Sequence, residues 1–178
     1  LHQAVKKLCE GPDGLYYALL FQGGITCFDK DIEKFLPVRF DKPLELKDIL
    51  DFCWNDGSLY LVTSQGLFES RIVRKTEGKH DFVLCLLNPE PVVRGKIAHL
   101  CSDGKTNLYF SVNQRKVVHH DLVAKKTSLI KEYSVVNRLF LRYGYLWICR
   151  LWDDIICYDL KTNEERVISM EGKDQSRS

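Results

Sequence analysis

Residues 100 to 109 read LCSDGKTNLY, and this stretch decides the fold because its pattern recurs along the chain. An apolar residue and a cysteine precede a short turn that contains Asp-Gly, and a Leu-Tyr pair follows the turn. The same order occurs from Leu8 to Tyr16 and from Phe52 to Tyr60, and a degenerate copy without the cysteine runs from Phe140 to Trp147. Self-similarity at a regular spacing is the signature of a repeat architecture.

A second sequence landmark recurs in each of the same four units. The leucines of the Leu-aromatic pairs are residues 15, 59, 108 and 146, which is a period of roughly 40 to 50 residues. Downstream of each pair, an aromatic residue or a histidine is followed by an acid, at Phe28-Asp29, Phe68-Glu69, His120-Asp121 and Tyr158-Asp159. Two landmarks that recur together four times predict four equivalent structural units.

Each unit divides into short runs rich in Val, Ile, Leu and aromatic residues, separated by turn residues, which predicts strands. In the second unit the predicted strands are about 49–54, 59–63, 67–73 and 82–87. Asp-Gly pairs at residues 13–14, 56–57 and 103–104 can supply the positive φ of tight hairpins. Residues 44–53 also fit a helical spacing, but we prefer a strand because the stretch aligns with strands of the other units.

The predicted fold is therefore all-β: a β-propeller with four blades of four antiparallel strands. A single unit would expose a sheet face to water, and stacking against its neighbours buries that face. The predicted blades are about 1–43, 44–92, 93–134 and 135–171, so that they fill residues 1–171, and the polar residues 172–178 form a flexible tail. Four blades could close as a small ring or form part of a larger one.

The pattern resembles the repeats of WD40-like β-propellers in the broad sense, over nearly the whole chain. In WD40 blades a Trp-Asp pair ends the third strand, and the aromatic-acid landmark stands at that place here, for example as Tyr158-Asp159. The literal Trp152-Asp153 pair lies instead between the second and third strands of the last unit. What the resemblance implies is the fold, together with a role as a platform for other proteins.

The amino-acid composition limits the classes of molecule that we expect the chain to bind. The net charge is only +2 and the pI is about 8.2, which is far from the basicity expected of a nucleic-acid-binding domain. No apolar run approaches the roughly 20 residues that span a bilayer, so we expect no membrane span. Seven cysteines without a CxxC pair, and no Asn-x-Ser/Thr acceptor, favour a reducing compartment, the cytoplasm or the nucleus.

Residues that could carry chemistry have simpler structural interpretations. Cys9, Cys53 and Cys101 are equivalent in the repeat, so they should pack in separate sheets rather than share a metal. His119 and His120 are adjacent and should point to opposite faces of a strand, which prevents them from binding one metal ion. The repeated acids should end a strand or bond a neighbouring turn rather than bind calcium. We therefore expect no enzyme, no cofactor and no metal.

Two surface features are candidate partner-binding sites. Arg150, Leu151 and Trp152 lie in a predicted turn, and Trp with Arg is the usual composition of a binding hot spot. A basic stretch could contact an acidic partner, and it comprises Arg71, Arg74 and Lys75, followed by Lys79 and His80.

The predicted function is a non-catalytic protein-interaction scaffold within a larger protein or complex, an inference by analogy with the fold. Two alternatives remain open. In the first, the chain has an architectural role in a ring completed by a second subunit. In the second, it is an enzyme or a ligand-binding propeller that uses the central channel, and this alternative predicts ionisable side chains converging on the axis.

Overall fold

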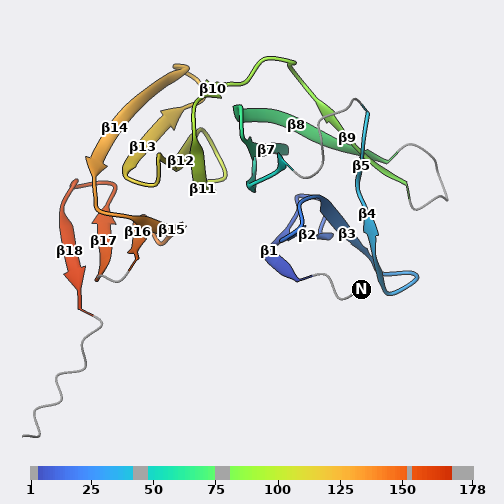
Figure 1. Cartoon of the computed structure of the whole chain (residues 1–178), viewed down its shortest axis with the longest axis horizontal. Helices are drawn as coiled ribbons and strands as arrows, with labels where there is room; N and C mark the ends of the chain where they lie inside the picture. The colour runs from blue at the N-terminus through green and yellow to red at the C-terminus, as the bar shows by residue number, and fades with distance from the viewer. Residues whose placement is uncertain (1–3, 42–47, 75–80, 152–153, 170–178) are drawn as a thin grey trace, which may run out of the picture.

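A computed structural model of the chain describes residues 4–41, 48–74, 81–151 and 154–169. The predicted all-β fold is confirmed, because four antiparallel sheets are arranged as four blades of a β-propeller (Figure 1). None of the described residues belongs to a helix long and apolar enough to cross a membrane.

The first and second sheets contain ten strands. The first sheet has the order β1 (Val5–Glu10), β2 (Tyr16–Leu20), β3 (Ile25–Asp29), β4 (Lys34–Pro37). The main strands of the second sheet are, in order, β6 (Asp51–Asn55), β7 (Ser58–Thr63), β8 (Gly66–Arg74) and β9 (Phe82–Leu86). Two short strands join its outer part: β5 (Arg39–Phe40) pairs in parallel with β9, and β10 (Val93–Arg94) pairs with β8.

The third and fourth sheets have four strands each. The third sheet consists of β11 (Ile97–Ser102), β12 (Asn107–Val112), β13 (Lys116–Asp121) and β14 (Lys126–Glu132). The fourth consists of β15 (Val136–Arg142), β16 (Tyr145–Arg150), β17 (Ile155–Asp159) and β18 (Glu165–Ile168). In both sheets the strands pair in sequence order, as in successive hairpins.

The second sheet begins earlier in the chain than the sequence pattern indicated, because β5 precedes the predicted start near residue 44. The preference for a strand over a helix in residues 44–53 is confirmed from Asp51 onward, where β6 begins. Residues 44–47 lie outside the described part of the chain, as do residues 172–178 of the predicted tail.

Positive φ angles at the hairpin turns explain the recurrent Asp-Gly pairs. Asp56 and Gly57 have φ of 45° and 78°, which suits the two-residue turn between β6 and β7. In the degenerate fourth unit, Tyr143 and Gly144 have φ of 54° and 79°. The same backbone geometry is therefore kept although a tyrosine replaces the aspartate.

The repeated acids bond the turns that follow them, as expected. In Asp29, Asp121 and Asp159, Oδ1 accepts hydrogen bonds from the backbone N–H groups two and three residues later, at 2.8 to 3.4 Å. The backbone bonds from Ala124 and Val123 lower the pKa of Asp121. Glu69 differs, since its carboxylate accepts a hydrogen bond from the Ser58 hydroxyl at 2.9 Å.

Apolar clusters between adjacent sheets form the core. The first cluster joins the first and second sheets through residues such as Tyr17 and Phe52, and the second joins the second and third sheets through Tyr60 and Phe110. The third joins the third and fourth sheets. Within the described residues no such cluster joins the fourth sheet to the first, and Figure 1 shows the four sheets as an arc around a shared centre.

Candidate functional site at the propeller axis

The innermost strands of the first, second and fourth sheets place a polar residue at the same register position, and the third places a histidine beside it, in the irregular part of β11. Cys9, Cys53, Cys101 and Phe140 are equivalent, because each lies opposite an aromatic residue of the second strand, Tyr17, Tyr60, Tyr109 and Trp147. In the first sheet the Leu-aromatic pattern was wrong by one residue, since it aligned Tyr16 with Tyr60 whereas the register aligns Tyr17. Two residues before these positions stand Lys7, Asp51, His99 and Arg138, which we call the axial residues.

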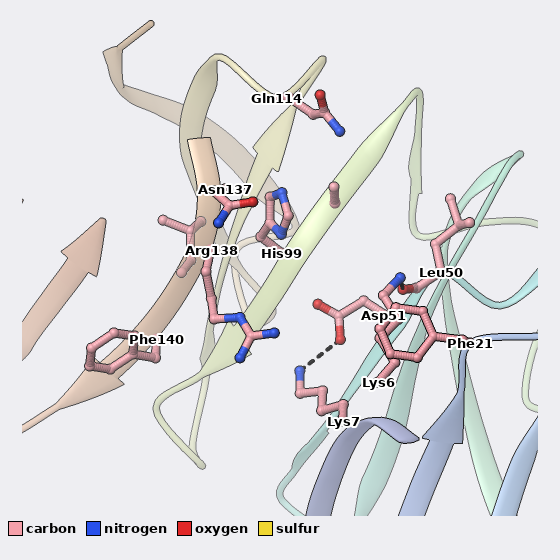
Figure 2. A pocket seen from close by; sticks show the side chains of 12 residues that line it. Lys6, Lys7, Phe21, Leu50, Asp51, His99, Gln114, Asn137, Arg138 and Phe140 are labelled. Atoms are coloured by element: carbon pink, nitrogen blue, oxygen red, sulfur yellow. Dashed lines mark hydrogen bonds and ion pairs between the residues drawn. The ribbon is translucent and has the colours of Figure 1, made fainter. Parts of the chain in front are cut away.

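The axial residues line a pocket of about 480 Å³ at the centre of the arc (Figure 2). Its remaining polar lining comes from Lys6, Gln114 and Asn137, while Phe21 and Phe140 are among its apolar walls. The pocket is therefore built by the first, second, third and fourth sheets together.

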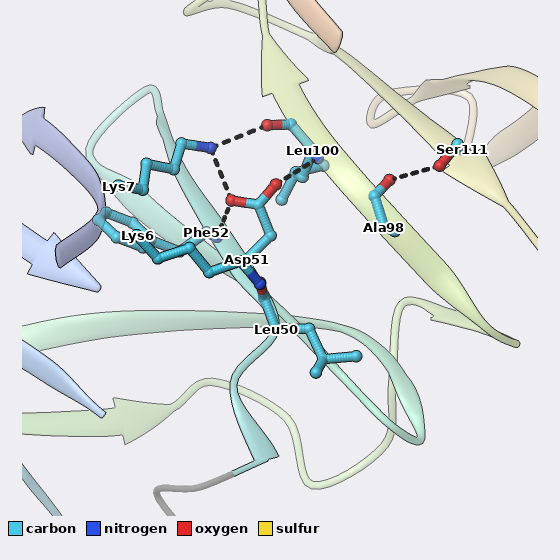
Figure 3. A network of polar contacts seen from close by, with 8 residues as sticks. All are labelled: Lys6, Lys7, Leu50, Asp51, Phe52, Ala98, Leu100 and Ser111. Carbon is cyan, nitrogen blue, oxygen red and sulfur yellow. Dashed lines mark hydrogen bonds and ion pairs between the residues drawn. The ribbon is translucent and has the colours of Figure 1, made fainter. Parts of the chain in front are cut away.

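The Asp51 carboxylate connects three of the sheets (Figure 3). Its Oδ1 accepts hydrogen bonds from the backbone N–H of Phe52 and from Lys7 Nζ, both at 2.7 Å. Its Oδ2 accepts one from the backbone N–H of Leu100, also at 2.7 Å. Lys7 Nζ additionally donates to the carbonyl oxygen of Leu100 at 3.1 Å. Because all these groups are partly buried, the network holds the innermost strands in register.

The pairing with Asp51 shifts the pKa of Lys7. Burial by itself would lower the pKa of Lys7, but the nearby Asp51 carboxylate outweighs burial, so the pKa of Lys7 lies above its ordinary value. Lys7 is therefore a charged partner of Asp51 at neutral pH. It is poorly suited to act as a base.

His99 connects the third sheet to the fourth. It lies in an irregular part of β11 with φ of 55°, and its ring lies near the backbone of Val136. Burial lowers the pKa of His99. Arg138, by contrast, is exposed, and its side chain makes no hydrogen bond or ion pair with the described residues.

The equivalent cysteines pack in three different places, as expected. Cys9 packs against the first apolar cluster, Cys53 belongs to the second, and Cys101 packs against the third. Burial raises the pKa of all three thiols, that of Cys101 to about 12. These thiols are therefore protonated at neutral pH, and all seven cysteines of the chain are free.

The adjacent histidines have structural partners on opposite faces of β13. His120 is buried, and its Nδ1 lies 2.8 Å from Thr127 Oγ1. The ring of His119 stacks on Tyr109 with the ring centres 5.2 Å apart, and its Nε2 lies 2.6 Å from Asn107 Oδ1. The described residues contain no group of three or more His, Cys, Asp or Glu side chains that could hold a metal ion.

The described members of the predicted partner-binding set are not among the residues that line the axial pocket, and they belong to two different blades. Arg150 ends β16, and its Nε donates to the carbonyl oxygen of Asp154 at 3.3 Å; Leu151 is exposed. Arg71 and Arg74 are exposed on β8, where the Arg74 guanidinium lies 5.7 Å from the centre of the Phe82 ring. Outside the described residues lie Trp152, Lys75, Lys79 and His80.

Sequence reasoning missed the axial residues, although a signal was present. The residue two positions before each recurrent cysteine is always polar, but it is a lysine, an aspartate and a histidine in turn. The fourth unit has no cysteine, and its pattern aligned Leu141 with the cysteines, whereas the observed register aligns Phe140. Arg138 could be recognised only from that register.

Comparisons with known proteins show the fold. No protein-family model and no curated protein matches the chain. Among solved structures, the extracellular domain of a one-component system from B. thetaiotaomicron is similar with a TM-score of 0.71 and 13% identity, over 94% of this chain and 24% of that one. An auxiliary nutrient binding protein from Bacteroides thetaiotaomicron has a TM-score of 0.63 and 15% identity, over 92% and 41%.

A WD40 domain is also among the similar structures, in agreement with the resemblance of the repeats. The Pan2 WD40 domain of Neurospora crassa has a TM-score of 0.60 and 11% identity, over 92% of this chain and 50% of that one. The chain thus spans half or less of the length of these three solved structures. At such identities the likeness concerns the fold alone.

Proposed function

We propose that the chain is a non-catalytic protein-interaction domain that forms part of a larger propeller ring. In this proposal its two end sheets bind further blades, and the complete ring presents its loops to protein partners. The observation that carries the proposal is the exposure, at both ends of the arc, of register positions that are buried between the sheets.

The outer face of the first sheet is apolar. Leu8 and Tyr16 lie on it and are 56% and 42% exposed. The residues at the matching positions of the second sheet, Phe52 and Leu59, pack against the first sheet and are 0% exposed. Phe35 extends the outer face and contacts Phe28, with the ring centres 5.1 Å apart. Exposed apolar faces of this kind mark interaction sites.

The outer face of the fourth sheet has the same character. Phe140 is 42% exposed and stacks on Trp147, with the ring centres 5.8 Å apart and the planes 3° from parallel. Trp147 is paired across the sheet with Cys157, so the apolar row continues over three strands. The matching positions in the second sheet, Cys53 and Tyr60, are buried against the third sheet.

Further antiparallel blades would fit against the outer faces of the first and fourth sheets. The three observed interfaces use the same register positions, and an added blade would repeat an interface that the chain already forms three times. The arc in Figure 1 leaves such blades a place between the fourth and first sheets. The solved propellers of which this chain covers half or less also contain further residues beyond the matched part.

Self-association of the isolated chain tests the proposal. We expect the wild-type chain to associate with rising concentration in sedimentation velocity, because its end faces are apolar. A Leu8→Glu, Phe140→Glu double variant should sediment as a monomer. Val123→Glu is the control, since Val123 is exposed in the turn between β13 and β14 and lies on neither end face. A wild-type chain that remains monomeric at every concentration, also in salt high enough to screen the charges at its ends, would contradict the proposal.

The loop residues named from the sequence keep their place in this proposal as contacts of a protein partner. They are Arg150, Leu151 and Trp152 on one blade, and Arg71, Arg74 and Lys75 on another. The seven free thiols support a reducing compartment, and we propose the cytoplasm or the nucleus as the location.

A ligand-binding propeller is the second candidate, because ionisable side chains do converge at the axis. However, two of the four axial residues already bond to neighbouring sheets, because Lys7 and Asp51 bind each other and the Leu100 backbone. Their pairing favours a structural role over a ligand site.

A further inference from the structure

The axial residues follow a directional pattern. Lys7 of the first sheet binds Asp51 of the second sheet, and Asp51 accepts a hydrogen bond from the Leu100 backbone of the third (Figure 3). His99 of the third sheet lies near the backbone of Val136 in the fourth. In each case an axial side chain reaches the innermost strand of the following sheet.

Arg138 is the fourth member of this series, and it lies in the last sheet that the described residues form. Arg138 is paired across the sheet with Cys149, and it lies on the same end face as Phe140 and Trp147. Figure 2 shows its side chain extending from β15 into the pocket without a dashed contact. An axial cation is therefore presented at the point where a following blade would begin.

We propose that the blade that follows the fourth sheet presents an aspartate or glutamate on its innermost strand to Arg138. This inference rests on the proposed function and specifies the chemistry of the partner blade. The Lys7–Asp51 pair is the internal precedent, with 2.7 Å between Nζ and Oδ1. A guanidinium can bind a carboxylate through two parallel hydrogen bonds, so Arg138 both selects an acidic blade and sets its register.

Charge argues against a second copy of the chain as this partner. Two copies closing head to tail would place the first sheet of one copy against the fourth sheet of the other. The axial residue of the first sheet is Lys7, and Lys6 lies beside it in the pocket. Lys6 donates to the Leu50 carbonyl at 2.5 Å, and it forms no ion pair with the described residues. Arg138 would then face cations, and such juxtaposition suppresses association.

Reversing the charge at Arg138 tests the inference. In an Arg138→Glu variant, residue 138 would face Lys6 and Lys7 of a second copy, and we expect a discrete dimer in sedimentation equilibrium. Its dissociation constant should be lower than that of any wild-type dimer by about tenfold or more, and added salt should weaken it. Arg115→Glu is the matched control, since Arg115 is an exposed residue outside the axial series in the turn between β12 and β13.

Each outcome decides a separate claim. A wild-type chain that already forms a discrete dimer as tight as the variant would overturn the inference and make a second copy the occupant. An Arg138→Glu variant that associates no more tightly than the wild type would also overturn the inference. The proposed function would still stand in that case if the Leu8→Glu, Phe140→Glu substitutions abolished association. If neither the wild type nor the Arg138→Glu variant associates, both proposals fail. Circular dichroism checks that each variant is folded.

Discussion

At the scale of single residues, one carboxylate connects more of the molecule than any of the sequence landmarks. Asp51 accepts hydrogen bonds from its own strand, from the first sheet and from the third sheet, through Phe52, Lys7 and Leu100. Two of these donors are backbone N–H groups of partly buried innermost strands. A buried donor left unpaired costs about 1–3 kcal/mol, so the loss of Asp51 affects all three sheets.

We therefore expect Asp51→Asn to lower the free energy of unfolding by about 2–4 kcal/mol, because Lys7 loses its counterion and the network loses an acceptor. Urea unfolding followed by circular dichroism measures the change. Asp31→Asn is the control, since Asp31 is exposed in the turn after β3, and its effect should stay within about 0.5 kcal/mol. Equal effects of the two substitutions would show that the network does not stabilise the fold.

At the scale of strands and turns, glycines that share a positive φ have different neighbours. Gly57, between β6 and β7, has φ of 78°, and a Cβ added there would meet nothing within 4 Å. Gly66 has φ of 141°, and its added Cβ would lie 2.2 Å from the carbonyl oxygen of Val93 in β10. A glycine is thus required at position 66 for two reasons, its positive φ and the close approach of β10.

The comparison of Gly57→Ala with Gly66→Ala separates these two requirements. Gly57→Ala should lower the free energy of unfolding by about 1–2 kcal/mol, the cost of a left-handed residue with a side chain. Gly66→Ala should lower it further, because β10 must also move away from β8. Thermal unfolding followed by circular dichroism gives both values, and equal losses would mean that the β10 contact contributes nothing.

At the scale of the whole molecule, the position of a sheet in the arc decides how many interfaces support it. The second and third sheets each take part in two apolar clusters, whereas the first and fourth take part in one. The stability of stacked repeats is approximately the sum of the repeats and their nearest-neighbour interfaces. The end sheets should therefore open before the central sheets when the isolated chain is destabilised.

Two cysteines with matched exposure can report this difference. Cys53 in the second sheet and Cys157 in the fourth are 7% and 8% exposed in the folded chain. We expect iodoacetamide to label Cys157 at a lower urea concentration than Cys53, as measured by mass spectrometry of the modified peptides. Coincident labelling midpoints would instead show that the four sheets unfold as a single cooperative unit.

The sequence by itself determined the parts of the structure that depend on neighbouring residues. Turns at Asp56-Gly57 and Tyr143-Gly144, the acid-to-turn bond of Asp121, and the four-strand units all arise from contacts within a few positions, and these repeat as visible patterns. The partner-binding role of Trp152 remains a prediction.

Only the tertiary structure decided the axial site and the open ends of the arc. Lys7, Asp51 and Arg138 occupy one register position with three different side chains, and His99 lies beside that position in the third sheet. The Lys7–Asp51 pair shows that neighbouring sheets use complementary groups rather than identical ones. A search for similarity cannot detect complementarity between residues of different repeats. The burial of Phe52 and the exposure of Leu8 at equivalent positions likewise depend on which sheet lies opposite, and no local pattern encodes that.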